Sequence, residues 1–253
     1  MRGPLSFAAA TILQKAALDE GFDIDLGESG GWLKFESTQT PVAIALTVDG
    51  AGWLAAVSGA PVAAELRREG APAAPLAPTG YDDAFLFDDA ASLHRLLARA
   101  RMLGRALPTE PLDRFIARSR SLPRTTEAER LVIQRIGQDI FREALIEFWN
   151  GRCPLSGIDE PLLLRASHIK PWADCATDAE RLDVYNGLLL AAHLDAAFDV
   201  GLIGSDEIGS IVLSSHLSAE NAARLGLTSS SGLRLSAPHL PFIRWHRLHV
   251  FRR

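Results

Sequence analysis

The sequence has little cysteine and no long apolar run. Only two cysteines, Cys153 and Cys175, occur among its 253 residues, which excludes a disulfide-stabilised scaffold and favours a reducing, cytoplasmic environment. Neither has a second cysteine or a histidine at zinc-knuckle spacing, so no structural zinc site is expected. Polar residues interrupt each apolar stretch within about ten residues, which is too short to span a bilayer. We therefore expect a cytoplasmic protein without a membrane partner.

The net charge of −5 argues against nucleic-acid binding until it is divided along the chain. Residues 1–94 carry 5 basic and 13 acidic side chains, and residues 95–124 carry 8 basic and 2 acidic ones. Residues 125–204 carry 7 and 13, and residues 205–253 carry 6 and 3. Two basic segments therefore flank an acidic one, where they are suited to contact phosphates. A solvated helix face followed by an exposed tail would give the same pattern, so both interpretations stay open.

The first 110 residues predict a small mixed α/β domain. Three segments have the apolar spacing and end signals of helices, at residues 5–18, 61–69 and 91–107. Three shorter segments alternate or run apolar between turn signals, as strands do, at residues 32–36, 42–48 and 53–57. Asp49 and Gly50 separate the last two, which predicts an antiparallel hairpin within a small sheet.

Three prolines mark the end of this domain. Pro108, Pro111 and Pro123 bracket a short segment that contains arginines, and proline interrupts both helices and sheets. We therefore predict one domain at residues 1–110, followed by a basic connector at residues 111–124.

A long helix is predicted to begin the second domain, residues 125–253. Thr126 and Glu129 have the spacing of a capping box, which fixes the start of a helix. Apolar residues then continue with mostly helical spacing as far as Asn150 and Gly151.

Three short blocks follow this helix. They are Ala166–Trp172 (ASHIKPW), Asn186–Leu190 (NGLLL) and His193–Gly201 (HLDAAFDVG). In this order, the blocks give a histidine at the end of one strand, an asparagine at the start of a second strand, and a short helix. This arrangement resembles the HNH endonucleases of the ββα-metal superfamily. The resemblance covers roughly residues 127–205 and does not reach the first 110. It implies a C-terminal ββα-metal nuclease domain that hydrolyses DNA with a divalent metal ion.

His168 is the candidate general base. The predicted strand at residues 162–169 holds it on a rigid element, and imidazole can accept a proton at neutral pH because its ordinary pKa is about 6.5. The resemblance assigns the same role to the histidine at this position. A histidine that only stabilises a strand end is the alternative interpretation.

Asn186 is the second candidate catalytic residue. It precedes a second apolar strand, Leu188–Leu190, and its amide can bond the backbone on both sides of the loop that returns from His168. The resemblance implies that this asparagine fixes the loop. An ordinary Asn-Gly turn would have the same sequence.

Asp195 and Asp199 are the first candidates for metal ligands. They are four residues apart on a predicted helix that ends before Gly201, so both can reach one ion from the same face. His193 lies about 200° around the helix from Asp195 and is the third candidate. Carboxylate ligands favour Mg²⁺ or Mn²⁺. Asp199 has an alternative role at the helix end, and simple solvation would also explain the pair.

Ser167 departs from the pattern of the family. Many relatives have an acidic residue or a histidine immediately before the base, where that residue binds the metal. A serine hydroxyl is a poor ligand, so water and DNA phosphates would have to complete the coordination shell. The set of metal ligands therefore stays open.

Candidate DNA contacts lie beside the motif and at the C-terminus. Guanidinium groups match phosphate oxygens, and tryptophan can stack on a sugar or a base. The candidates near the motif are Arg165, Lys170 and Trp172. Those at the C-terminus are Arg244 and Arg247, together with the neighbouring residues His246, His249, Arg252 and Arg253. Taken singly, each is also explained as an ordinary surface residue.

The sequence thus predicts an α+β protein with an N-terminal mixed domain, a long linker helix and a C-terminal HNH nuclease domain. The predicted function is metal-dependent DNA hydrolysis, by a restriction-type endonuclease whose N-terminal domain selects the target. A catalytically inactive DNA-binding or regulatory protein that retains the fold is the alternative, and Ser167 keeps it open. A third hypothesis is a toxin or effector whose acidic N-terminal region binds another protein. DNA is the predicted partner, and a homodimer is left open.

Overall fold

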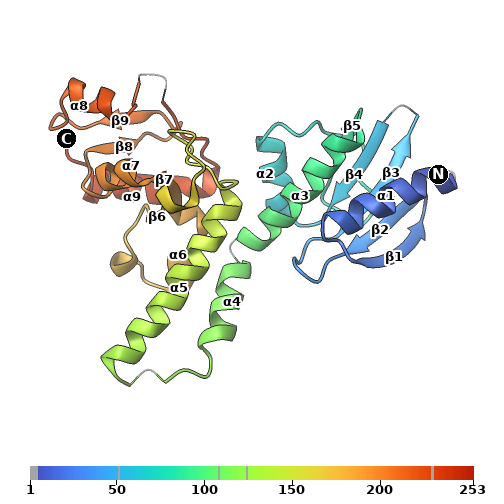
Figure 1. Ribbon diagram of the computed structural model, residues 1–253, viewed down its shortest axis with the longest axis horizontal. Coiled ribbons are helices and arrows are strands. Elements are labelled where there is room, and N and C mark those ends of the chain that lie inside the picture. The colour runs from blue at the N-terminus through green and yellow to red at the C-terminus, as the bar shows by residue number, and fades with distance from the viewer. Residues whose placement is uncertain (1–4, 51, 108, 124, 229–230) are drawn as a thin grey trace. The chain divides into compact units, whose positions relative to one another are not determined.

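The computed structural model describes residues 5–50, 52–107, 109–123, 125–228 and 231–253 (Figure 1). The chain divides into two compact units, residues 1–105 and residues 106–253. Pro108, on which the predicted domain boundary partly rests, lies outside the described residues, and so does Arg124 of the predicted connector. No helix in the described ranges is long and apolar enough to cross a membrane.

The first unit is built on an antiparallel sheet with the strand order β1-β2-β3-β4-β5 (Figure 1). Its strands are β1 (Ile24–Ser29), β2 (Trp32–Glu36), β3 (Ile44–Asp49), β4 (Gly52–Val57) and β5 (Asp83–Phe87). Its helices are α1 (Phe7–Asp19), α2 (Ala60–Arg68) and α3 (Ala90–Ala106). Helix α1 packs against β2 and β3. Part of the core joins Trp32, Leu54 and Ala84 to Tyr81 in the loop before β5.

The structure confirms the three predicted helices of this unit and the three predicted strands, which are β2, β3 and β4. No sequence pattern predicts β1 or β5. All six residues of β1 are exposed, and only Ile24 and Leu26 are apolar, which is too short an alternation to mark a half-buried strand. After Asp83, the other four residues of β5 are a short apolar run, which periodicity alone does not assign.

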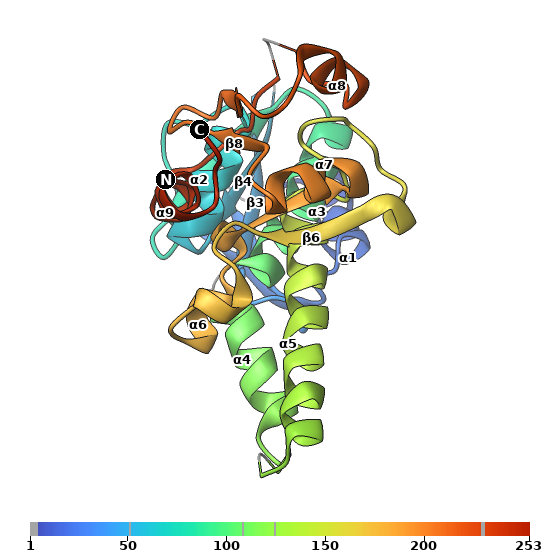
Figure 2. The ribbon, with the colours of Figure 1, turned by 90° about the vertical axis from the view of Figure 1, so that its left-hand side faces the viewer.

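The second unit contains a two-stranded antiparallel sheet, β6 and β7, which lies between helices α5 and α7 (Figure 2). Its helices are α4 (Thr109–Ser119), α5 (Glu127–Phe148), α6 (Asp178–Leu182), α7 (Ala192–Asp199), α8 (Ala219–Arg224) and α9 (Leu240–His249). Its strands are β6 (Leu164–His168), β7 (Gly187–Ala191), β8 (Ile203–Ser205) and β9 (Ile211–Leu213). Short 3-10 turns are formed by Pro161–Leu163, Trp172–Asp174, Val184–Asn186 and Ala237–His239.

The predicted long helix is confirmed as α5, and so is its capping box. The Thr126 hydroxyl accepts a hydrogen bond from the Glu129 amide (3.2 Å), and the Glu129 carboxylate accepts one from the Thr126 amide (2.9 Å). The segment predicted as a connector contains most of α4, which packs along α5 in the second unit (Figure 2). Its function as a basic connector stays a prediction.

The predicted strand at residues 162–169 was too long at its start. Pro161 begins a 3-10 turn, in which the Glu160 carboxylate accepts a hydrogen bond from the Leu162 amide (3.2 Å). The Arg142 guanidinium of α5 also donates to the carbonyls of Pro161 (2.8 Å) and Leu164 (2.9 Å). These contacts use backbone groups that a longer strand would pair, so β6 begins only at Leu164.

The C-terminal segment holds the end of α7 through the backbone. Gly201, which follows α7, has a φ of 72°, and its carbonyl accepts a hydrogen bond from the Arg252 amide (3.0 Å). A Cβ added at Gly201 would lie 2.1 Å from the carbonyl oxygen of Val250. Glycine is therefore required here by the backbone conformation and by the close approach of the two chain segments.

Replacing Gly201 with alanine is expected to destabilise the second unit by about 3 kcal/mol or more, since a positive φ costs a residue with a Cβ about 1–2 kcal/mol and overpacking adds about 1–3 kcal/mol. Gly226 is the matched control, because its φ is 74° and no atom of the described residues lies within 4 Å of an added Cβ. Urea unfolding followed by circular dichroism measures both variants. Equal losses of stability would contradict the importance of the contact with Val250.

Candidate active site

A cavity of about 460 Å³ opens in the second unit beside β6 and α7. Strand β6 supplies Arg165, Ala166, Ser167 and His168, the following loop supplies Pro171 and Trp172, and α7 supplies Asp195 and Asp199. The cavity therefore brings together five of the residues predicted from the sequence: Arg165, His168, Trp172, Asp195 and Asp199. Its lining does not include the other predicted residues, which are Lys170, Asn186, His193, Arg244 and Arg247.

His168 is held at the end of β6, where it pairs with Gly187 of β7. Its ring stacks on Phe141 of α5, with a centroid distance of 3.8 Å and an interplanar angle of 15°. The Trp172 ring is nearly perpendicular to the His168 ring, with a centroid distance of 5.6 Å and an interplanar angle of 89°. On the neighbouring strand β7, a Cβ added at Gly187 would lie 2.5 Å from the same Phe141 ring. Glycine at this position therefore leaves room for the ring on which His168 stacks.

A backbone carbonyl determines the tautomer of His168. Its Nε2 lies 2.8 Å from the carbonyl oxygen of Arg181. Because a carbonyl oxygen only accepts hydrogen bonds, the proton of the neutral ring is assigned to Nε2. Nδ1 is then the nitrogen with a free lone pair, and it can accept a proton.

Burial lowers the pKa of His168 to about 4, although the hydrogen bond to the Arg181 carbonyl acts in the opposite direction. The charged ring loses more solvation than the neutral one when it is placed against Phe141 and Trp172. At pH 7 only about one ring in a thousand is therefore protonated. The ring is available as a proton acceptor at neutral pH.

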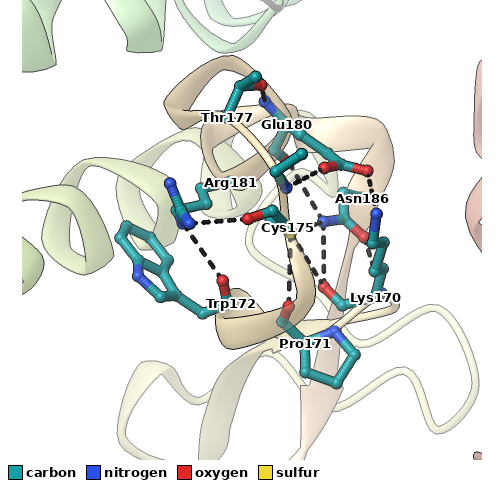
Figure 3. Close-up of polar contacts among 9 residues, drawn as sticks. Lys170, Pro171, Trp172, Cys175, Thr177, Glu180, Arg181 and Asn186 are labelled. Carbon is teal, nitrogen blue, oxygen red and sulfur yellow. Dashed lines mark hydrogen bonds and ion pairs between the residues drawn. The ribbon is translucent and has the colours of Figure 1, made fainter.

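Asn186 is fully buried and ties together the two ends of the loop between β6 and β7 (Figure 3). Its Oδ1 accepts a hydrogen bond from the Lys170 amide (2.8 Å). Its Nδ2 donates to the carbonyls of Lys170 (3.1 Å) and Glu180 (3.2 Å) and to Sγ of Cys175 (3.3 Å). The amide thus bonds both sides of the loop, which is the geometry expected from the sequence.

Asp195 and Asp199 lie on the part of α7 that lines the cavity. Partial burial raises the pKa of both carboxyl groups. The charge of Asp195 raises the pKa of Asp199 further, whereas the Ser167 hydroxyl, which donates to Asp199 (3.4 Å), opposes the shift. The guanidinium of Arg165 lowers the pKa of Asp195. Both carboxyl groups thus lie at one wall of the cavity, where burial disfavours their charged form.

The donor set fits a hard divalent cation with open coordination positions. In the described part of the chain, no three His, Cys, Asp or Glu side chains gather in a way that could hold a metal. His193 is exposed and does not line the cavity. Mg²⁺ is commonly held by one or two carboxylates together with water and phosphate oxygens, and Asp195 and Asp199 supply such a pair.

The predicted DNA contacts are placed in different surroundings. Arg165 lines the cavity, and its Nη1 donates to the Leu162 and Leu164 carbonyls (both 3.0 Å). Lys170 pairs with Glu180 (2.6 Å). Arg244 pairs with Glu207, whereas Arg247 is exposed. The contacts of Lys170 and Arg244 occupy their charged groups in the free protein.

Of these two C-terminal histidines, only His246 departs from the expectation of an exposed basic residue, and His249 is exposed. His246 is only 2% exposed, stacks on Phe198 at 4.0 Å and lies with Nε2 3.1 Å from the Phe198 carbonyl. Burial lowers its pKa. His249 stacks on Trp245 at 4.5 Å. The interpretation of His246 as a DNA contact is wrong, because its ring is part of the core between α7 and α9.

Two residues at the site were missed by sequence reasoning. Phe141 belongs to the predicted apolar stripe of α5, but periodicity does not identify the ring on which it packs. Arg181 is one of many charged residues, and no spacing relates it to His168. Both contacts arise from the tertiary structure.

Comparison with known protein families gives a match that includes the residues of this cavity. Residues 153–204 match the family model of an HNH endonuclease. A search of curated proteins gave no significant match. The matched segment contains β6, β7 and α7, and with them all the cavity residues. It confirms the family predicted from the sequence and the C-terminal position of the HNH domain in a mixed α/β fold, and it supports nuclease activity in general.

The His168 ring is expected to stay neutral from pH 8 down to about pH 5 in the metal-free protein, with its proton on Nε2. Its lowered pKa means that the ring becomes charged only as the pH falls through about 4. Two-bond ¹H–¹⁵N correlation spectra of the imidazole measure the tautomer and the titration. A ring that titrates near pH 6.5, or that carries its proton on Nδ1, would contradict the assignment.

Proposed function

Residues 153–204 belong to the HNH endonuclease family, and from this premise we propose that the protein is a metal-dependent nuclease that hydrolyses phosphodiester bonds of DNA. The observation that carries the proposal is the cavity, because it joins a neutral histidine of β6 to two carboxylates of α7. Phosphodiester hydrolysis needs a base for the attacking water and positive charge near the phosphate. His168 is suited to the first task, and the aspartate pair is suited to bind a cation for the second.

In the proposed reaction, Nδ1 of His168 accepts a proton from the attacking water. The water oxygen bonds to phosphorus, and the bond between phosphorus and the 3′ oxygen breaks with its electron pair on that oxygen. The hydrogen bond from Nε2 to the Arg181 carbonyl keeps the ring oriented and becomes stronger when the ring is charged. A base that is neutral at pH 7 is ready for this step without first losing a proton.

Asp195 and Asp199 are the proposed ligands of a divalent ion, Mg²⁺ or Mn²⁺. When bound, the ion supplies positive charge to the phosphate and to the departing oxygen. The Ser167 hydroxyl supports Asp199 and is not a proposed ligand. His193 remains a weaker candidate, because its exposed side chain lies outside the cavity lining.

DNA is the proposed substrate, and the side chains that remain accessible are the proposed contacts. Arg165 and Trp172 line the cavity, so they are placed to meet the phosphate or sugar next to the scissile bond. Arg118 and Arg120 are exposed at the end of α4 and beyond it, and Arg247 is exposed on α9. Asn186 is proposed to act through the loop and not through the substrate, since it is fully buried.

A restriction-type function with target selection by the first unit is part of the same proposal. It is supported by the division into two units, of which the first lies outside the HNH match. The argument is one of architecture, because a separate domain beside a nuclease domain is suited to choose the target.

A second candidate function is DNA binding without catalysis. Ser167 stands where many relatives have a metal ligand, and the described residues provide two carboxylates and no third metal-binding side chain beside them. A protein of this kind would bind DNA and leave it intact in Mg²⁺, in Mn²⁺ and in EDTA. Incubation with methylated and unmethylated plasmid under these three conditions separates the two candidates.

Replacing His168 with alanine is expected to lower the cleavage rate by about 10²–10⁴-fold, the usual contribution of a positioned base. DNA affinity should change little, because the ring is largely enclosed by Phe141 and Trp172. Plasmid nicking with Mg²⁺ or Mn²⁺ measures the rate. The control is His216→Ala, since His216 is an exposed histidine of the same unit outside the cavity. Full cleavage by folded His168→Ala protein would rule out this base.

Replacing Asp195 with alanine is expected to abolish metal-dependent cleavage and to weaken binding of Mn²⁺, because half of the carboxylate pair is lost. Asp199→Ala is expected to have the milder effect of the two, since Asp199 also sits at the end of α7. Isothermal titration calorimetry with Mn²⁺ measures binding apart from activity. Unchanged binding in Asp195→Ala together with a loss in His193→Ala would move the metal site to His193.

A further inference from the structure

The Arg181 guanidinium makes three hydrogen bonds within the loop between β6 and β7. Figure 3 shows two of them, to Trp172 and to Cys175. Its Nε donates to the carbonyl of Trp172 (3.2 Å), and its Nη2 donates to the carbonyl of Cys175 (2.7 Å). Its Nη1 donates to the Asp178 carboxylate (2.9 Å). Hydrogen bonds from a charged donor are the stronger ones in a protein, and this side chain is only 23% exposed.

The backbone carbonyl of the same residue accepts the hydrogen bond from His168 Nε2 (2.8 Å). The guanidinium of Arg181 therefore holds the loop, while its carbonyl orients the ring of His168. A shift of α6 would move this carbonyl and weaken the bond that assigns the ring proton to Nε2.

Arg181 also contacts the aromatic wall of the cavity. Its Cζ lies 5.8 Å from the centroid of the Trp172 ring, within the range of a cation–π contact. The Trp172 ring meets the His168 ring edge-on and packs where a Cβ at Gly137 would lie 2.5 Å from it. Both neighbours of the His168 ring on this side, the carbonyl and the indole, are thus positioned by one arginine.

Arg181 and Asn186 divide the loop between them. Asn186 bonds the backbone of Lys170, near the start of the loop, and of Glu180 in α6. Arg181 bonds the backbone of Trp172 and Cys175, which lie between those ends. Trp172, which lines the cavity, is therefore held by Arg181 and not by Asn186.

We propose that Arg181 is a positioning residue for His168, which holds the loop so that the Arg181 carbonyl keeps the ring proton on Nε2 and leaves Nδ1 free to accept a proton. The part that concerns catalysis rests on the proposed nuclease function. The part that concerns the tautomer does not, because it follows from contacts within the free protein.

The test compares Arg181→Met, which keeps an apolar stem and removes the guanidinium, with Arg181→Lys and Asp178→Asn. The matched control is Arg224→Met, because Arg224 also lies in the last turn of a short helix and pairs with an acidic residue one turn earlier, Glu220. Imidazole ¹⁵N spectra of the metal-free full chain report the tautomer of His168. Cleavage of duplex DNA with Mg²⁺ or Mn²⁺ reports kcat and KM separately.

Arg181→Met is expected to populate the Nδ1-protonated form and to lower kcat by about 10–100-fold, the effect typical of residues that orient a functional group. KM should stay within about threefold, because no contact with DNA is removed. Arg181→Lys should restore part of kcat, since it keeps a charged donor. Asp178→Asn and Arg224→Met should match the wild type, because both keep the two carbonyl contacts of Arg181.

A folded Arg181→Met protein with an unchanged tautomer and an unchanged kcat would overturn the proposal. If Arg181→Met does not give a cooperative thermal transition, Arg181→Lys decides the question by the same two measurements. A wild-type protein without nuclease activity would refute the proposed function. A shift of tautomer in Arg181→Met would still support the positioning by Arg181, and its absence would still exclude it.

Discussion

The hydrogen bond from His168 Nε2 to the Arg181 carbonyl decides which ring nitrogen can accept a proton. A carbonyl cannot donate, so this one contact excludes the other neutral tautomer as long as the loop holds its shape. The loop in turn depends on the buried amide of Asn186 and on the guanidinium of Arg181. In the proposed mechanism, the chemistry of the base is thus set by polar contacts in a loop with little regular structure.

A second histidine in the same unit has a similar geometry but does not line the cavity. His246 stacks on Phe198 and lies with Nε2 3.1 Å from a carbonyl, much as His168 stacks on Phe141 and bonds Arg181. Burial lowers the pKa of both rings. The difference is access, since His168 lines the cavity and His246 does not. His246 instead fixes α9 to the end of α7.

Local sequence predicted the elements whose signals are local. The capping box of Thr126 and Glu129 marks the start of α5, and the four-residue spacing of Asp195 and Asp199 places both on the cavity side of α7. The edge strand β1 carries no buried residue, so periodicity gives no signal for it. The sequence around the start of α4 contains prolines, which predict a connector. The packing of α4 against α5 is a tertiary contact that this local signal does not include.

Contacts between distant parts of the chain could not be predicted in this way. Phe141 lies 27 positions before His168 in the sequence, and only the packing of α5 against the sheet brings the two rings together. His246 lies in a sequence segment rich in basic residues, which is typical of a surface, yet its ring is buried. The family motif supplied His168 and Asn186 directly, but Arg181, whose carbonyl bonds the His168 ring, is not part of any of the three sequence blocks.

Because Ser167 precedes His168 in place of an acidic residue or a histidine, the proposed metal site has only two carboxylate ligands. Among the described residues, two aspartates and no third acidic side chain line the cavity. The charge of Arg165 acts to lower the pKa of Asp195. A divalent ion held by only two carboxylates keeps several positions for water and phosphate oxygens. Its affinity therefore depends on the DNA phosphate that completes the shell, so in the proposed mechanism metal and DNA each strengthen the binding of the other by the same factor. Ser167 contributes through its hydrogen bond to Asp199, which acts against the rise in the pKa of that carboxyl group that burial and the charge of Asp195 cause.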